Sequence, residues 1–320
     1  MRFAFYTMTM NTSPLFWPVF LKDEIIYILD ETALPQKTVY LKAKNYHQAC
    51  RAIRTMKTRA VGQVLLVFYV FLQIVRTNHG KKNLHRLLEN AAEEINSSRP
   101  TLAFKVLTDM VLEWSKKGFP LEKCLRNFLE QLKGFRIRQA EAASRLLKDK
   151  DVVLTHCNVS GLMPLIGQFC RKDKKRVSFY VTETRPYLQG ARLSSWELRD
   201  QGFDVTIIAD NMVAQVMHEG KIDKVIVGAD NLAENGDIAN KIGTYQIAIL
   251  ARHFKIPFYV LCPPRSRSKS GRQIKIEIRP EEELLEFNGK RIAPKGVKGY
   301  YPAFDITPKH LITRHIHLES

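Results

Sequence analysis

Short apolar runs alternate with amphipathic stretches after Asp151, and this alternation restricts the possible folds more than any other feature of the sequence. Strands that alternate with helices at this spacing form right-handed βαβ units and a parallel sheet. The runs are almost continuously apolar, as expected for strands that are covered on both faces. We therefore predict an α/β domain whose strands are 152–155, 177–182, 205–209, 225–227 and 258–261.

The preceding part of the chain, from about Lys44 to Lys150, has the periodicity of amphipathic helices. Pro100 separates two of these helices, because the residue before a proline avoids helical geometry. Apolar residues recur at intervals of three and four, as at Leu84, Leu87, Leu88, Ala91 and Ile95.

Two β-rich runs near the start of the chain, 24–30 and 38–41, predict a short β-hairpin. The chain is therefore predicted to contain a mainly helical domain at 1–148, with this hairpin at its start. An α/β domain follows at 149–320.

No segment has the length of a membrane span. The most hydrophobic stretch, 64–75, has twelve residues and includes Gln73, whereas crossing a bilayer takes roughly 20. We predict a buried helix or a packing interface there, and no membrane attachment. Polar residues and prolines interrupt residues 1–20, unlike a signal peptide.

The five scattered cysteines include no CxxC pair, which favours the reducing cytoplasm over a disulfide framework or a zinc site.

The net charge of +18 lies mostly in the N-terminal half. Residues 1–150 contain 25 Lys and Arg against 13 Asp and Glu, and residues 151–320 contain 25 against 19. Such a surface attracts small anions such as sugar phosphates as readily as nucleic acid. No RNP-type motif or zinc finger accompanies the charge, so a nucleic-acid partner is not expected. The basic segment 263–275 is predicted to be a mobile surface loop.

Polar and reactive residues follow each predicted strand. In open α/β sheets, ligands bind beyond the carboxyl ends of the strands. Five strand ends that deliver such groups to one edge of the sheet predict an active site there. The groups are Thr155-His156-Cys157-Asn158, Glu183-Thr184-Arg185, Asp210-Asn211, Asp230-Asn231 and Cys262.

The sequence lacks the motifs of common cofactor sites. No GxGxxG opens the first βα turn, and there is no GxxxxGK[ST] loop. The nine histidines are dispersed and form no HExxH motif. We therefore expect no nucleotide cofactor and no metal.

Cys157 ends a predicted strand shortly before a predicted helix. A thiol near a helix N-terminus loses its proton more easily and can then act as a base or a nucleophile. The alternative is a buried structural cysteine, which is the more common situation. Cys262 also ends a strand and is a second candidate of the same kind.

Asp230 follows the strand 225–227, where burial would raise its pKa and let it act as an acid. The alternative is a carboxylate that caps a turn. Asp237, in an Asn-Gly-Asp sequence, is typical of turn chemistry. Residues 240–244 are predicted to open a helix whose N–H groups, with Lys241, are a candidate phosphate or hydroxyl site.

Several segments resemble the methylthioribose-1-phosphate isomerase family, which also contains ribose-1,5-bisphosphate isomerases and the regulatory subunits of translation initiation factor 2B. The resemblance is dense from about 151 to 308 and implies a Rossmann-like C-terminal domain, a helical N-terminal domain and a homodimer. The matching segments are 29–35, 155–158, 183–193, 228–230, 234–245 and 302–308.

The resemblance places the family's catalytic cysteine at Cys157 and its catalytic aspartate at Asp230. It also implies substrate contacts at Gln189, Asn240, Lys241, Arg59 and Arg99. Four features depart from the family pattern. The glycine that usually follows Cys-Asn-Thr is displaced to Gly161, and residues 312–315 lack the usual glutamate. Arg59 is followed by Ala-Val-Gly instead of Gly-Ala-Pro, and Asn231 stands where an arginine is usual.

The resemblance further implies an aldose–ketose isomerisation, from S-methyl-5-thioribose 1-phosphate to S-methyl-5-thioribulose 1-phosphate, in methionine salvage. Asp230 would protonate the ring oxygen and Cys157 would act as the base at C2, with proton and hydride transfer both open. One alternative is a related substrate, ribose 1,5-bisphosphate or 5-deoxyribose 1-phosphate. Another is a non-catalytic regulatory subunit like those of initiation factor 2B.

Overall fold

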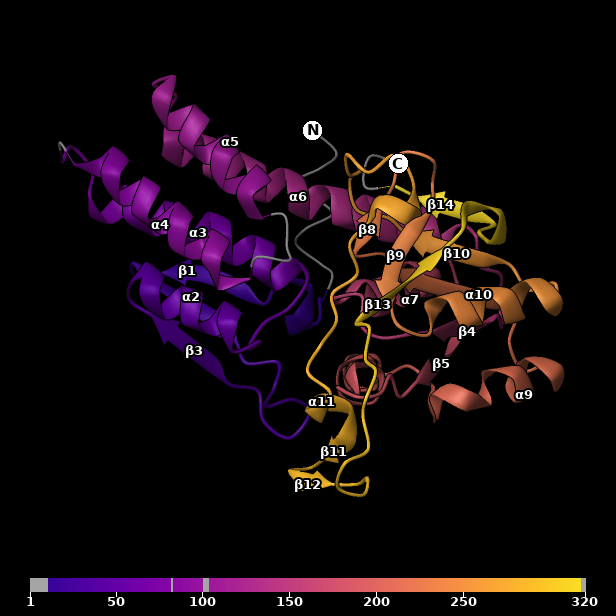
Figure 1. Ribbon diagram of the computed structural model, residues 1–320. Helices are drawn as coiled ribbons and strands as arrows, with labels where there is room; N and C mark the ends of the chain where they lie inside the picture. Colours follow the sequence, from indigo (N-terminus) through magenta and orange to yellow (C-terminus); the bar gives the residue numbers. More distant parts are fainter. Residues whose placement is uncertain (1–10, 82, 100–103, 318–320) are drawn as a thin grey trace. The chain divides into compact units, whose positions relative to one another are not determined.

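The computed structural model describes residues 11–81, 83–99 and 104–317 (Figure 1). The chain divides into two compact units, Pro14–Gly134 and Phe135–Ser320 together with Met1–Ser13. We call them the N-terminal unit and the C-terminal unit. The division falls inside helix α6 (Leu121–Ser144), whereas the sequence places the boundary after this helix, at 148–149.

A three-stranded antiparallel sheet begins the N-terminal unit. The predicted hairpin is confirmed as β2 (Ile25–Leu29) and β3 (Tyr40–Ala43). The strand β1 (Val19–Lys22), which pairs with β2, was not predicted. The two residues between β1 and β2, Asp23 and Glu24, have φ of 48° and 59°, as a type I′ turn requires. Asp-Glu is not a typical sequence for that turn, so the local signal is weak.

Helix α3 (Val61–Thr77) provides much of the N-terminal core. Most of its residues are buried, including nearly all of 64–75, which confirms the buried helix predicted there. Within the described residues, no helix combines the length and the apolar character that a membrane span needs. The other helices of this unit are α2 (Tyr46–Arg54), α4 (Leu84–Ser98), α5 (Phe104–Lys116) and the first part of α6.

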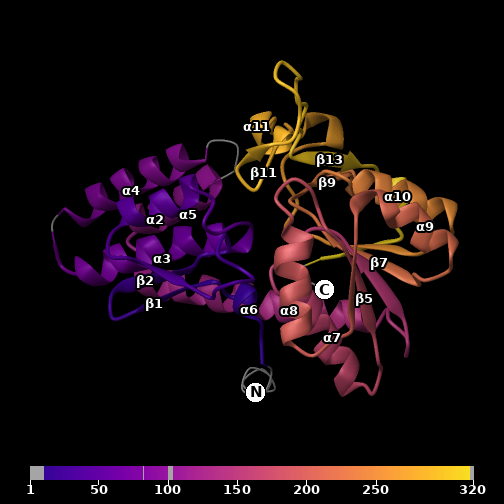
Figure 2. The same ribbon diagram turned by 90° about the horizontal axis from the view of Figure 1, so that it is seen from below.

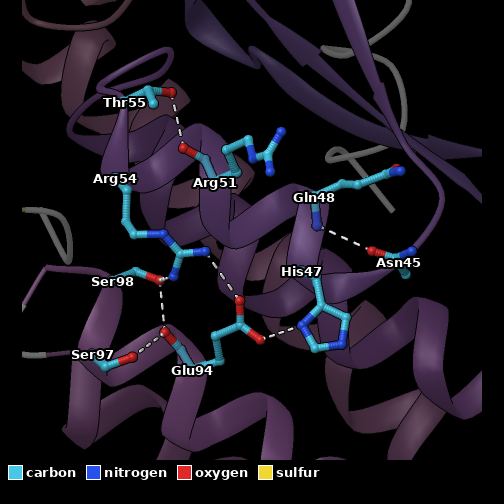
Figure 3. Close-up of polar contacts among 9 residues, drawn as sticks. All are labelled: Asn45, His47, Gln48, Arg51, Arg54, Thr55, Glu94, Ser97 and Ser98. Atoms are coloured by element: carbon cyan, nitrogen blue, oxygen red, sulfur yellow. Dashed lines mark hydrogen bonds and ion pairs between the residues drawn. The ribbon is translucent and has the colours of Figure 1, made fainter.

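Polar contacts join α2 to α4 (Figure 3). Asn45 caps α2 by accepting a hydrogen bond from Gln48 N. Glu94 lies 3.2 Å from Arg54 Nη2 and 2.5 Å from His47 Nδ1. Such exposed pairs contribute little free energy. They do show that part of the basic surface is paired with acidic groups.

A parallel six-stranded sheet forms the centre of the C-terminal unit (Figure 1). All five strands predicted from the apolar runs are present, and the predicted α/β fold is confirmed. A sixth strand, β14, lies at the edge. In spatial order the strands are β14 (Arg314–Ile316), β10 (Phe258–Leu261), β7 (Lys224–Gly228), β4 (Val152–Thr155), β5 (Ser178–Thr182) and β6 (Val205–Ile208).

The order of the strands decides which helices cover each face. From β4 the chain moves outward to β5 and β6 through α7 (Leu162–Lys172) and α8 (Ser195–Asp200). It then returns to β7, on the other side of β4, through α9 (Val213–His218), and continues to β10 through α10 (Thr244–His253). Because crossovers are right-handed, the two pairs of helices cover opposite faces (Figure 2).

A small antiparallel sheet follows β7 in the chain. It consists of β8 (Asn231–Leu232), β9 (Ile238–Lys241) and β13 (Phe304–Thr307), with β9 in the middle. The helix α11 (Glu282–Leu285) and the hairpin β11–β12 (Glu286–Phe287, Lys290–Arg291) lie between β10 and β13 in sequence.

Phe68 on α3 tests the N-terminal core. Its side chain is fully buried and its ring stacks on Phe128 with a centroid distance of 4.0 Å. Because Phe68→Ala would leave a cavity, we expect the free energy of unfolding to fall by about 3–5 kcal/mol in urea titrations. Phe119, which is 47% exposed, is the control, and Phe119→Ala should cost less than about 0.5 kcal/mol. Equal losses in both variants would contradict this description of the core.

Candidate active site

Cys157 and Asp230 follow the two neighbouring strands at the centre of the sheet. Strands β4 and β7 are parallel and paired, with Leu154 opposite Val225. The chain leaves these two strands in opposite directions, so the crevice beyond their carboxyl ends is a topological switch point, where α/β proteins bind ligands. The structure therefore brings the two predicted catalytic residues to adjacent strand ends.

The loop after β4 rests against the end of β7. A Cβ atom added to Gly228 would lie 2.7 Å from Val159 Cγ1. Only glycine allows the strand end to approach the Cys157 loop this closely. The glycine two residues before Asp230 thus helps to set how near the two strand ends lie.

Cys157 is half-buried and has an unusual backbone conformation, with φ of 65°. A left-handed conformation costs a residue other than glycine about 1–3 kcal/mol, and such residues cluster at functional sites. Two hydrogen bonds hold it in place: Cys157 N donates to Thr184 Oγ1 at 2.9 Å, and Ser194 Oγ donates to Cys157 O at 2.6 Å. The backbone that carries the thiol is therefore held from two other segments.

Asn158 organises the rest of this loop. Its Oδ1 accepts a hydrogen bond from Ser160 N at 2.8 Å. Its Nδ2 donates to Ser194 Oγ at 3.0 Å and to Glu197 Oε1 at 2.8 Å. The side chain thus connects the Cys157 loop to helix α8.

Glu197 on α8 is a buried carboxyl behind this loop. Ser13 Oγ donates to its Oε2 at 3.0 Å, in addition to the bond from Asn158. Burial raises the pKa of Glu197 to about 8, against the opposing effect of these hydrogen bonds and of the Arg136 charge. Glu197 is not predicted from the sequence, because a single glutamate in a helical segment carries no local signal of this role.

His156 has a structural role beside Cys157. It is buried, and its Nε2 lies 2.9 Å from Ile242 O, so Nε2 carries the proton and donates it. Nδ1 can then accept from Thr182 Oγ1, at 2.6 Å. Burial lowers the pKa of His156, which keeps the ring neutral. The ring joins the ends of β4 and β5 to the turn after Lys241.

Asn240 and Lys241 end strand β9, and both side chains are buried. The Lys241 ammonium lies 4.9 Å from the centroid of the Phe304 ring, in a cation–π contact. Lys241 is followed by Ile242, whose carbonyl oxygen lies 2.9 Å from Nε2 of His156, the residue before Cys157. The structure thus brings the predicted substrate-binding lysine close to the predicted catalytic cysteine.

The helix predicted to open at residues 240–244 begins only at Thr244, because 238–241 pair with β13 as a strand. Two N–H groups there are already used: Gly243 N donates to Asp305 Oδ2 at 2.7 Å, and Tyr245 N donates to Asp305 Oδ1 at 3.0 Å. Burial raises the pKa of Asp305 to about 6. The prediction of a phosphate site on these N–H groups is therefore wrong, since a carboxylate of the chain itself occupies them.

Two buried acceptors near the strand ends lack hydrogen-bond partners among the described residues. They are Gln189 Oε1, on a side chain that is 5% exposed, and Asn231 Oδ1, next to Asp230. The chain after Gln189 passes close to β5, since a Cβ on Gly190 would lie 1.8 Å from Thr182 O. Buried acceptors without partners cost free energy, and a ligand that donates hydrogen bonds would satisfy them.

Asp230 is exposed, which corrects the expectation that burial raises its pKa. Its backbone N–H donates to Ala239 O at 2.9 Å. Cys262, the second candidate thiol, is buried, and burial raises its pKa to about 12, so it is a structural cysteine. Of the two strand-end cysteines, only Cys157 is accessible.

Asp237 has the turn role predicted for it. It accepts hydrogen bonds from Gly271 N and Lys309 N, both at 3.0 Å. An open surface depression of about 540 Å³ lies beside it, lined partly by Lys309 and His315. None of the predicted site residues lines this depression.

The basic segment 263–275 is hydrogen-bonded to the β8–β9 region. Ser266 N donates to Leu232 O at 2.8 Å, and Glu234 N donates to Ser268 O at 2.9 Å. The predicted mobile loop is therefore attached through its backbone at several points, which its charge pattern did not reveal.

Arg59 and Arg99 belong to the N-terminal unit, where the structure places them near each other. Arg99 Nη1 donates to Gln63 Oε1 at 3.2 Å, and Gln63 Nε2 donates to Thr58 O at 2.9 Å. Arg59 N donates to Glu31 Oε1 at 2.9 Å. Two acidic residues of the segment 29–35, Asp30 and Glu31, therefore hold the loop that carries Arg59 in place.

The fold and these strand ends define a doubly wound α/β protein with a candidate ligand site at the switch point. Residues 53–317 match the Initiation factor 2 subunit family, and the chain belongs to this family. Among proteins named methylthioribose-1-phosphate isomerase, those of Desulforudis audaxviator and Fervidobacterium nodosum are 37% and 36% identical to it. The alignments cover 95% and 96% of this chain and 92% and 93% of those proteins.

Two solved structures are similar over nearly the whole length. The 5-methylthioribose 1-phosphate isomerase of Pyrococcus horikoshii is 31% identical, with a TM-score of 0.83 over 96% of this chain and 93% of that one. The structure described as subunit delta of translation initiation factor eIF-2B from A. fulgidus is 32% identical, with a TM-score of 0.82 over 94% of both chains. These similarities confirm the family resemblance found in the sequence.

Glu197 makes stability depend on pH. Its pKa is raised in the folded protein from 4.5 to about 8, so its stabilising contribution is present below pH 4.5 and is lost as the pH rises through about 8. We expect the free energy of unfolding to fall by at least about 2 kcal/mol between about pH 5 and pH 9. Glu197→Gln should flatten this dependence, because it removes the titrating group. Parallel curves for the two proteins, from urea titrations across that range, would contradict the assignment.

Proposed function

We propose that this chain is an aldose–ketose isomerase that converts S-methyl-5-thioribose 1-phosphate to S-methyl-5-thioribulose 1-phosphate. One observation carries the proposal: Cys157 and Asp230 follow the two paired strands at the switch point of the sheet. Gln189, Asn240 and Lys241 lie in the same unit. The full-length similarity to proteins named for this reaction supports the same conclusion.

The chemistry needs an acid and a base on one sugar. The phosphate blocks the anomeric oxygen, so the ring opens only when an acid protonates the ring oxygen, and we assign this to Asp230. Hydrogen must then move from C2 to C1, and we assign the removal of the C2 proton to the Cys157 thiolate. Hydrogen moves within a single molecule, so the reaction needs no external electron carrier, and we propose that it is cofactor-independent.

Asp230 is exposed in the structure, although we assign it the role of an acid. An exposed carboxyl is ionised near neutral pH and is a poor acid. Binding of the sugar would remove water from Asp230 and raise its pKa toward the range that an acid needs. We therefore propose that Asp230 becomes a competent acid only in the complex with substrate.

Lys241 is a buried cation suited to hold the substrate phosphate. Arg59 and Arg99 are proposed as further phosphate ligands, and the net charge of +18 would attract the anion from solution. We also propose a cytoplasmic homodimer that does not bind nucleic acid. The five scattered cysteines, which include no CxxC pair, support the reducing compartment.

Cys157→Ser and Asp230→Asn test the acid–base assignment. Each should lower kcat by about 10²–10⁴-fold, because each removes a general acid or base, while circular dichroism and the unfolding midpoint stay near wild-type values. Formation of the ketose is followed by NMR with methylthioribose 1-phosphate, with and without a metal chelator. Turnover should be the same in both conditions.

Two control variants match these changes. Cys124→Ser alters a half-buried helical cysteine, and Asp237→Asn alters the turn carboxylate. Both should keep wild-type kcat, although Asp237→Asn should lower the unfolding midpoint because it weakens the acceptor for two backbone N–H groups. Near-normal turnover by Cys157→Ser or Asp230→Asn would remove that residue from the mechanism.

One alternative rests on a specific observation, the structural similarity to a protein described as an eIF-2B subunit. A regulatory subunit would copurify with a GTP-exchange partner and would convert no sugar phosphate. Ribose 1,5-bisphosphate and 5-deoxyribose 1-phosphate, assayed beside methylthioribose 1-phosphate, would identify a related isomerase instead.

A further inference from the structure

Tyr301 has a buried hydroxyl with an unusual environment. Its side chain is only 3% exposed, and its OH has no hydrogen-bond partner in the part of the chain that the structure describes. The residue before it, Tyr300, is 77% exposed. A buried hydroxyl usually has a partner, because leaving it without one costs free energy. The Tyr301 hydroxyl therefore has the properties of a group whose partner is a ligand.

The backbone places Tyr301 beside the candidate active site. It lies shortly before β13, whose Phe304 pairs with Lys241 on β9. The pairing continues past the strand end, where Ile242 N donates to Ala303 O at 3.1 Å. Tyr301 is thus two residues before Ala303, which accepts a hydrogen bond from Ile242. The carbonyl oxygen of the same Ile242 is contacted by His156, next to Cys157.

The electrostatic environment of the hydroxyl agrees with this position. Burial raises the pKa of Tyr301, and the charges of neighbouring groups, Cys157 among them, raise it further. This influence of Cys157 agrees with the backbone pairing, which holds Tyr301 near the turn that His156, the residue before Cys157, contacts. At neutral pH it stays protonated and can donate a hydrogen bond as well as accept one.

Tyr187 provides an internal comparison. Its ring packs edge-on against Tyr301, with centroids 6.3 Å apart. Its hydroxyl accepts a hydrogen bond from Arg279 Nη2 at 2.8 Å, whereas Arg279 N donates to the Tyr301 carbonyl at 2.9 Å. The same arginine thus satisfies one tyrosine hydroxyl and holds the backbone of the other. Tyr301 is thus held in place, and no residue that the structure describes hydrogen-bonds to its hydroxyl.

We propose that the Tyr301 hydroxyl is a substrate-binding group that hydrogen-bonds to a hydroxyl of the sugar, next to the carbon that Cys157 deprotonates. The hydroxyl on that carbon is bonded to the atom that loses its proton to the thiolate, so a group held near the Cys157 loop is well placed to reach it. This inference rests on the proposed function and deepens it, because it names a residue that selects for the sugar and not for its phosphate.

Three single substitutions remove one phenolic oxygen each and test the proposal. Tyr301→Phe removes the buried hydroxyl without a partner, Tyr187→Phe removes a partnered one, and Tyr300→Phe removes an exposed one. Without ligand, we expect the unfolding midpoint to be unchanged or higher for Tyr301→Phe and unchanged for Tyr300→Phe. It should be about 2 °C or more lower for Tyr187→Phe, because Arg279 loses an acceptor.

Binding then shows whether the hydroxyl contacts the sugar. By calorimetry, Tyr301→Phe should bind methylthioribose 1-phosphate about 3- to 10-fold more weakly than wild type. Its affinity for inorganic phosphate should stay within about twofold, because only the sugar contact is lost. Tyr300→Phe should bind both ligands as wild type does. In the turnover assay, kcat/KM of Tyr301→Phe should fall by about tenfold.

Two results would overturn the inference. One is a midpoint that falls in Tyr301→Phe as much as in Tyr187→Phe, since the hydroxyl would then be structural. The other is unchanged affinity of Tyr301→Phe for the sugar phosphate, or an equal loss for inorganic phosphate. Binding is measured without turnover, so a wild-type protein that binds the sugar phosphate but converts none would contradict the proposed function and leave the role of Tyr301 intact.

Discussion

The parallel pairing of β4 with β7 is the constraint on which the candidate site depends. The chain moves outward from β4 on one side and returns to β7 on the other, so a crevice forms beyond their carboxyl ends. This arrangement sets the positions of the two residues to which we assign the acid–base chemistry. Cys157 comes after one strand and Asp230 after the other. A different strand order would place the same two residues beyond strands that are not neighbours.

The sheet alone does not hold the thiol in position. The left-handed backbone at Cys157 is maintained by polar side chains from two other segments. Thr184 and Ser194 act directly, and Glu197, on the same helical segment as Ser194, acts through Asn158. Burying such groups is costly unless each finds a partner. Here the cost is offset by hydrogen bonds that fix one loop. Such a loop is rigid, which is what a catalytic group needs to keep its geometry.

The sequence predicts those parts of the fold whose signals are local. The strands of the parallel sheet are apolar runs, and the reactive residues stand directly after them, so both the fold class and the position of Cys157 and Asp230 could be predicted. The family resemblance then supplied the substrate-binding residues Gln189, Asn240 and Lys241, whose roles stay predictions. The structure adds that all five lie in one unit.

The remaining features depend on pairings between distant parts of the chain. Lys241 is the last residue of a strand and does not begin a helix, because β13, some sixty residues later, pairs with β9. Glu197 is recognisable only through Ser13, which is 184 residues away in sequence. Tyr300 and Tyr301 are neighbouring residues of the same type, yet Tyr300 is exposed and Tyr301 is buried. No pattern within a short window distinguishes such cases.

A crystal structure of the protein with methylthioribose 1-phosphate would test the central claim most directly, which is that two adjacent strand ends act on one sugar. The account predicts Cys157 Sγ about 3–3.5 Å from C2 and a carboxylate oxygen of Asp230 within hydrogen-bonding distance of the ring oxygen. A sugar bound with either residue out of reach of those atoms would contradict it.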